Sequence, residues 1–138
     1  MKTYKQKTIS INQLIDYENN SRTHSEEQIQ QIISSIETFG FTNPILVDEG
    51  NMIVAGHGRV MAAKRMDIDK VPCIILDGLT ENQKKAYVIA DNKLALNAGW
   101  DFGMLKIEIE SLQECDFDIN GLGFSEIEIE TIIGNELD

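Results

Sequence analysis

The chain has 138 residues, 42% of them hydrophobic, which is long enough for one domain with a real apolar core. Its 12 Lys and Arg residues against 23 Asp and Glu residues give a formal net charge of -11, which disfavours strong binding of the whole chain to nucleic acid. No run approaches the roughly 18 consecutive apolar residues of a membrane span. The N-terminus, MKTYKQKTIS, also lacks the apolar core of a signal peptide, so we expect a cytoplasmic protein without membrane contact.

The first 100 residues contain short apolar runs, typical of strands, and helix-like repeats. Ile9 and Ile11 alternate with polar residues and predict a strand. Ser25 followed by Gln28 forms a capping box that predicts a helix up to Phe39. Further strands are expected at 44–47, 52–54 and 71–76, and further helices at 58–66 and from residue 80 onward. The motifs thus alternate between strands and helix starts.

The residue pattern of the sequence changes after Trp100. Asp101 can cap one helix, and Ser125 with Glu128 can cap a second. The two IEIE stretches in this segment also alternate at the period of a strand, so strands remain an alternative there. We expect residues 1–100 to form one domain and residues 101–138 to form an acidic helical C-terminal extension.

The negative charge is concentrated in that extension. Residues 1–100 carry 11 Lys and Arg against 12 Asp and Glu, a net of -1, whereas residues 101–138 carry Lys106 against 11 acids, a net of -10. Such a run of acids is usually a solvated helical face. The alternative is an acidic arm that mimics nucleic acid or docks on a basic partner.

Three polar clusters interrupt the predicted elements: ENNSRTH at 18–24, GHGR at 56–59 and ADNK at 90–93. GHGR lies between an expected strand and an expected helix. A helix N-terminus offers amides and a partial positive charge, glycine lets the backbone approach an anion, and Arg59 would add a forked donor for phosphate oxygens. Spacing alone more often marks a plain turn, so a turn and a phosphate-binding loop both stay open at this point.

Several motifs in order resemble the N-terminal domain of the ParB and sulfiredoxin superfamily. The resemblance covers residues 8–101 and rests on NPILVDEGNMIVAGHGRVMAAKRM, VPCIILDGLTENQKKAYVIADNKL and AGWD. Within that superfamily, the sequence looks most like the ParB-like nuclease domains of phages and mobile elements, which are often encoded with or fused to DNA methyltransferases. The resemblance implies an α/β fold, with a small mixed sheet and flanking helices, in which the loop before the GHGR helix holds nucleotide phosphates.

The resemblance also implies which residues hold the phosphates. Gly56 and Arg59 match the phosphate-binding glycine and arginine of the ParB motif, and His57 and Gly58 lie between them. Arg22 matches the arginine of an early Asn-Pro-Arg box. With this addition, the anion-binding loop becomes the favoured interpretation of GHGR.

A metal site is implied in the same way. Asp91 and Asn92 resemble a Glu-Asn pair that faces the phosphates and Mg²⁺ in ParB. A hard cation held by carboxylate, amide oxygen and phosphate is chemically reasonable there. His57 or Glu18 could act as the base in a phosphoryl-transfer reaction.

The sequence departs from the family pattern at several points, of which Ser21, standing where the early box usually has proline, is the mildest. His57 and Gly58 stand where partition proteins have an acid and another arginine, so CTP hydrolysis of the partition type is not implied. Sulfiredoxins need a cysteine where His57 stands, which argues against that chemistry. Residues 101–138 also leave no room for both a helix-turn-helix and a dimerisation segment.

Three functions remain compatible with these patterns. The first is a nucleotide-binding switch or hydrolase that takes a nucleoside triphosphate with Mg²⁺. The second is a DNA-associated module, either a nuclease or a targeting or accessory subunit of a DNA methyltransferase. The third is an adaptor that keeps the fold without activity. The oligomeric state stays open, a homodimer being one option.

Overall fold

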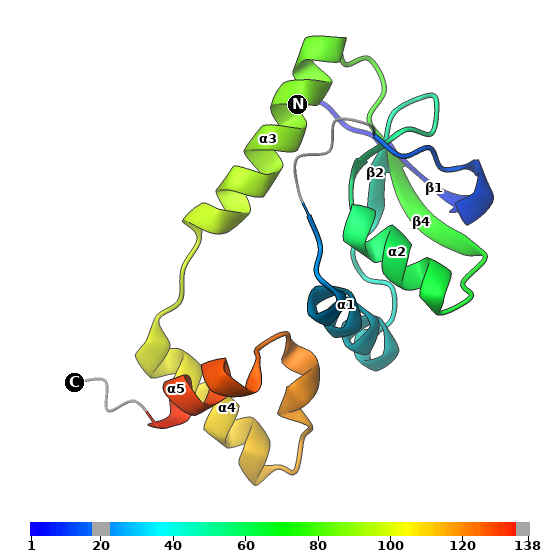
Figure 1. The fold of residues 1–138 in the computed structure, drawn as a ribbon. Helices are drawn as coiled ribbons and strands as arrows, with labels where there is room; N and C mark the ends of the chain where they lie inside the picture. Colours follow the sequence, from blue (N-terminus) through cyan, green and yellow to red (C-terminus); the bar gives the residue numbers. More distant parts are fainter. Residues whose placement is uncertain (18–22, 135–138) are drawn as a thin grey trace. The chain divides into compact units, whose positions relative to one another are not determined.

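The computed structural model describes residues 1–17 and 23–134, which form two compact units, Met1–Asn97 and Ala98–Asp138 (Figure 1). Among the described residues, the first unit combines a sheet with three α-helices and a short 3-10 helix, and the second unit contains only helical elements. Each unit has its own cluster of buried apolar side chains. Within the described ranges, no helix combines the length and apolar character needed to cross a bilayer.

A four-stranded mixed sheet forms the centre of the first unit. Its strands, in spatial order, are β1 (Lys5–Ser10), β4 (Lys70–Ile75), β2 (Ile45–Val47) and β3 (Ile53–Ala55). β2 is parallel to β4, whereas β1 pairs with β4, and β2 with β3, in antiparallel fashion. β1 continues into the short 3-10 helix η1 (Ile11–Gln13). The hairpin β2–β3 confirms the two neighbouring strands expected from the sequence.

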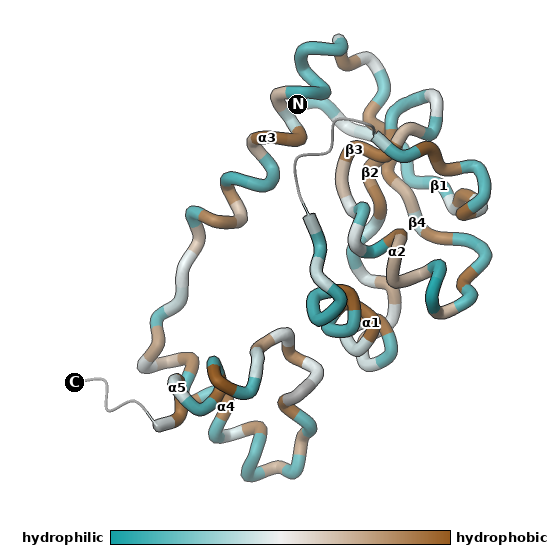
Figure 2. Tube along the Cα trace, in the orientation of Figure 1, coloured by the Kyte–Doolittle hydropathy of each residue, from teal (hydrophilic) through white to brown (hydrophobic). Residues whose placement is uncertain are grey.

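The three helices of this unit cover both faces of the sheet: α1 (Glu26–Phe39), α2 (His57–Arg65) and α3 (Glu81–Asn97). Val60 and Ala63 of α2 pack on the face that presents Val47, while Val88 of α3 packs on the opposite face against Val54. α1 packs against α2, and its Ile29 is fully buried. Figure 2 shows β2 and β3 as apolar segments, as expected for short strands covered on both faces.

The turn between β2 and β3 is closed by a buried acid, Asp48, which is 8% exposed. Its Oδ1 accepts hydrogen bonds from the amides of Gly50 (2.8 Å) and Met52 (2.9 Å), and its Oδ2 accepts one from Nζ of Lys84 (3.1 Å). Burial acts to raise the pKa of Asp48, but the bonds from Met52, Lys84 and Gly50 outweigh it and hold that pKa below its usual value. Asp48 therefore fastens the hairpin to α3.

The helix starts are those that the capping residues predict. Ser25 Oγ accepts from the Gln28 amide at 3.1 Å, and Asp101 Oδ1 accepts from the Met104 amide at 3.1 Å. Two further helices begin with a complete capping box, in which each residue's side chain accepts from the other's backbone amide: Thr80 with Gln83, and Ser125 with Glu128. These bonds satisfy first-turn amides that have no partner within the helix, so each box sets the point where its helix begins.

The second unit consists of α4 (Phe102–Glu114), the 3-10 helix η2 (Ile119–Leu122) and α5 (Glu126–Gly134). Ile109, Ile119 and Ile132 form its core. The alternative of strands at the two IEIE stretches is wrong, because both stretches lie in helices. At helical spacing only the second isoleucine of each stretch turns inward, so Ile109 is 1% exposed while Ile107 is 59% exposed.

Candidate functional site

The backbone between β3 and α2 makes a turn that requires glycine. Gly56 is the N-cap of α2 and has φ +101° and ψ 21°, in the left-handed region. A Cβ at Gly56 would lie 3.0 Å from Cδ1 of Ile45 and 3.1 Å from Nη2 of Arg59. Both the backbone conformation and the close approach of these side chains therefore depend on the absence of a side chain at this position.

Arg59 folds back toward this turn from the first turn of α2. The side chain is half-buried, and its Nη2 donates a hydrogen bond to the carbonyl oxygen of Pro44 at 3.2 Å. Asp48, a nearby acid in the sequence, instead accepts from Lys84. The guanidinium is thereby oriented beside Gly56, at the helix end where amides and the macrodipole favour an anion.

Gly58 has a packing role. A Cβ there would meet Cδ1 of Ile32 at 2.9 Å and Cε1 of His24 at 3.0 Å. α1 and the residue preceding its cap can therefore approach α2 this closely only because Gly58 lacks a side chain. This contact explains Gly58 without a ligand.

His57 is the half-buried first residue of α2. Burial lowers the pKa of His57, nearby Asp16 opposes that shift and His24 adds to it, with a net result below the usual value. A neutral imidazole is thus favoured at neutral pH. Its Nε2 atom is buried and has no hydrogen-bond partner among residues 1–17 and 23–134.

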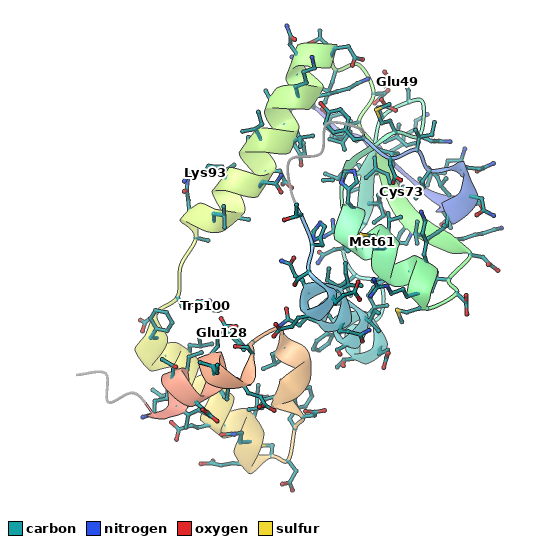
Figure 3. All side chains as sticks on the ribbon, viewed as in Figure 1. Glu49, Met61, Cys73, Lys93, Trp100 and Glu128 are labelled. Carbon is teal, nitrogen blue, oxygen red and sulfur yellow. The ribbon has the colours of Figure 1, made fainter. Side chains whose placement is uncertain are left out.

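The two residues expected at a metal site lie in the middle of α3 (Figure 3 labels the next residue, Lys93). Asp91 is exposed and Asn92 is half-buried. Consecutive helical residues point about 100° apart, so one of the two, rather than both, can face a given ion. Across the described part of the chain, no three His, Cys, Asp or Glu side chains gather in an arrangement suited to a metal.

The structure brings some of the expected residues together and leaves others aside. Gly56, His57 and Arg59 cluster at the start of α2, whereas Asp91 and Asn92 belong to the helix on the other face of the sheet. Both elements adjoin β3, because α2 follows it directly and α3 packs on it. The other expected residues, Glu18 and Arg22, lie outside the described residues.

Sequence reasoning did not assign His24, Asp16 or Pro44 to this site. His24 reaches Gly58 from a position 34 residues earlier in the chain, and Pro44 reaches Arg59 from 15 residues earlier. The polar cluster 18–24 was a signal for His24. Nothing in the local pattern around Pro44 could reveal a backbone acceptor for Arg59, because any residue type supplies a carbonyl.

Two known protein families match most of the chain between them. The family described as "ParB N-terminal domain" matches residues 2–92, and "ParB-methyltransferase HTH domain" matches residues 103–138. The first match confirms the resemblance drawn from GHGR and its neighbouring motifs. The second is a similarity to a helix-turn-helix family, which the sequence interpretation did not assign because the acidic charge of this segment suggested a solvated extension.

Individual proteins agree with these matches. The Escherichia coli K12 protein YnaK, described as ParB-like nuclease domain-containing, is 53% identical over 75 residues, which cover 54% of this chain and 86% of YnaK. Truncated ParB from Caulobacter crescentus, complexed with CTP-gamma-S, aligns at TM-score 0.75 and 22% identity, covering 94% of this chain and 77% of that one. Arabidopsis thaliana sulfiredoxin aligns at TM-score 0.51 and 17% identity, covering 61% of this chain and 97% of its own. At such identities the structural likeness establishes the fold alone.

Proposed function

The chain belongs to the ParB N-terminal domain family, and from that premise we propose that residues 1–100 bind a nucleoside triphosphate, or another phosphate ligand, with Mg²⁺ at the GHGR loop. One observation carries the proposal. Gly56 adopts a left-handed conformation at the N-terminus of α2, and the Arg59 guanidinium lies 3.1 Å from the position that a Cβ of Gly56 would occupy. This arrangement supports the proposal, because a helix N-terminus with a forked cation beside it would suit a phosphate.

The ParB structure with CTP-gamma-S makes a nucleotide a sensible ligand to test. Arg22 is a second candidate for phosphate contact, and His57 and Glu18 are candidate bases. The lowered pKa of His57 supports its candidacy, because a neutral imidazole can accept a proton at neutral pH. Gly58 would contribute its backbone amide only, since its side-chain position is filled by His24 and Ile32.

Asp91 and Asn92 would not hold Mg²⁺ by themselves, so phosphate oxygens of the ligand would have to complete its coordination. Mg²⁺ is typically bound through one or two carboxylates together with substrate phosphates and water. Asp91 offers a carboxylate and Asn92 an amide oxygen, of which one can face the ion. The ion would neutralise phosphate charge. The protein would then act as a nucleotide switch or hydrolase, or as a nuclease, in phage or mobile-element DNA metabolism.

A second function is favoured by the helix-turn-helix match at residues 103–138. It suggests a DNA-targeting or accessory module of a DNA methyltransferase without catalysis of its own. The net charge of -10 in residues 98–138 weighs against direct DNA contact by this unit.

Calorimetric titration of the whole chain separates the two functions. CTP, ATP and GTP would each be titrated with Mg²⁺ and again with EDTA, and a short DNA duplex would be titrated in parallel. We expect at least one triphosphate to bind and its affinity to fall without Mg²⁺. Binding of the duplex, with no triphosphate bound at millimolar concentration, would favour the DNA-targeting function instead.

A further inference from the structure

The second unit exposes apolar side chains among acids. Six large hydrophobic side chains are exposed in the described part of residues 98–134, against seven in the described part of the much longer first unit. Ile107 of α4 is 59% exposed and Ile127 of α5 is 75% exposed. Exposed apolar side chains are therefore more frequent per residue in the second unit than in the first, which favours the second unit as the place of an interaction surface.

The charge of this unit does not suit DNA. Residues 98–138 carry 11 acids and one base, Lys106, which is itself half-buried. Helix-turn-helix proteins commonly place the N-terminal residues of their second helix at base edges, between phosphates. Here the first turn of α5 presents the exposed acids Glu126 and Glu128, and the exposed Glu130 follows in the next turn. DNA phosphates would repel this helix end, and the sequence has no Lys or Arg after Lys106 that could neutralise them.

Some of these acids have a structural explanation. Glu128 completes the capping box, because its Oε1 accepts from the Ser125 amide at 2.9 Å (Figure 3 labels Glu128). Glu126 lies in the first turn, where the helix dipole favours a negative charge. Glu130 has neither role, and Glu108 and Glu114 of α4 lie outside the first turn of their helix. Helix formation therefore accounts for only part of the negative charge.

The two IEIE stretches share one pattern. In each, the second isoleucine packs toward the core and the first is exposed with a glutamate directly after it. An exposed isoleucine adds nothing to the helix, since its branched side chain lowers helix propensity. Buried against a partner, it would contribute a hydrophobic contact, and the surrounding glutamates would select for positive charge.

We propose that the second unit docks, through Ile107 and Ile127 and the glutamates beside them, on a protein surface that carries lysine and arginine side chains around an apolar centre. Charge complementarity identifies this occupant. DNA has the wrong charge for an acidic surface, and a simple cation would make no use of the exposed isoleucines. The helix-turn-helix fold would then serve recognition of a protein rather than of a duplex. This inference is independent of the nucleotide site in the first unit.

Binding of the whole chain to three labelled probes tests the proposal by fluorescence anisotropy at about 0.15 M salt. The first is an amphipathic helical peptide with lysines around a leucine face. The second has serine in place of every leucine, and the third is a DNA duplex. We expect the lysine–leucine peptide to bind at least about tenfold more tightly than the lysine–serine peptide, and the duplex not to bind.

Two variants assign the binding surface. The double substitution Ile107→Ser with Ile127→Ser should reduce affinity for the lysine–leucine peptide to that for the lysine–serine peptide, with an unchanged melting curve because both side chains are exposed. Ile89→Ser is the matched control, since Ile89 is 65% exposed on a helix of the first unit, and it should bind like the wild type. Equal affinity for both peptides, absence of peptide binding, tight duplex binding, or wild-type affinity in the double variant would each overturn the proposal.

Discussion

The two units build their helices by the same local rules but distribute charge in opposite ways. In the first unit, with a net of -1, two cations are paired with acids: Arg65 with Glu26 through two 2.6 Å bonds, and Lys84 with Asp48. The sequence of the second unit contains one lysine and eleven acidic residues. Capping and hydrophobic spacing are enough to specify a helix, so the charges of its exposed face are left to select the ligand. A family fold alone therefore does not identify what the second unit binds.

Loss of Arg59 should have the largest effect and should be confined to the first unit. Charge-assisted hydrogen bonds contribute on the order of 1.5 to 3 kcal/mol, so Arg59→Ala should weaken nucleotide binding roughly 10- to 150-fold. Arg65→Ala is the matched control on the same helix, because Arg65 pairs with the exposed Glu26 and lies at the other helix end. Calorimetry, with a melting curve for each variant, gives both quantities.

Three outcomes distinguish phosphate binding from a structural role of Arg59. Arg59→Lys should recover part of the affinity, because a lysine keeps the charge and loses the forked geometry. If Arg59 serves only to hold Pro44, the alanine variant should melt at a lower temperature and bind nucleotide as the wild type does. Equal loss of affinity in Arg65→Ala would mean that general positive charge, and not this site, attracts the nucleotide.

Two helical glycines offer a second contrast between the units. At Gly58 a Cβ would lie 2.9 Å from Ile32 Cδ1, whereas at Gly103 the nearest atom is Asp101 Oδ1 at 3.5 Å. Gly58→Ala should therefore lower the free energy of unfolding by about 1 to 3 kcal/mol through overpacking. Gly103→Ala should instead raise it by up to about 1 kcal/mol, because alanine is the better helix former. Urea unfolding of both variants measures the difference, and a stable Gly58→Ala chain would contradict the close packing of α1 on α2.

Local signals predicted much of the fold, and long-range contacts explain what they missed. Caps such as Ser25 act within four residues, so the sequence displays them directly. The role of Gly58 depends on His24, and the turn acid Asp48 depends on Lys84, 36 residues later. Such contacts arise only once the elements pack. The exposed Ile107 is a third case, since an isolated IEIE run fits strand and helix alike.

Removal of the second unit should have a smaller, electrostatic effect. Truncation after Asn97 leaves a net charge of -1, so affinity for a DNA duplex at low salt should rise by roughly tenfold and fall again as salt is added. The gain in DNA affinity is limited, because two of the cations in the first unit, Arg65 and Lys84, are already paired with acids. Anisotropy with a labelled duplex measures it. A truncated chain that keeps its melting transition and binds no better than the whole chain would show that the acidic unit does not shield the first.

The smallest expected effect is a pH dependence that originates in the first unit. Both histidines, His24 and His57, belong to this unit, and burial lowers the pKa of His57 in the folded chain. Below the usual histidine pKa of about 6.5, the unfolded chain therefore binds a proton that folded His57 does not, and stability decreases as the pH falls through that value. Asp48 does not contribute in this window, because its pKa is lowered from an already acidic value.

Melting curves at pH of about 7.5 and about 5.5 measure this dependence, and His57→Gln should reduce it. Trp100, the only tryptophan, packs against Phe124 with the rings tilted at 51° and their centroids 5.6 Å apart, and it lies in the second unit, which has no histidine. Its fluorescence therefore follows the second unit, while circular dichroism follows both. The acid-induced loss should appear in the dichroism curve and be weaker in the Trp100 curve. An equal loss in both curves that persists in His57→Gln would show that groups other than His57 cause the pH dependence. The loss of stability at low pH would then not originate in the first unit.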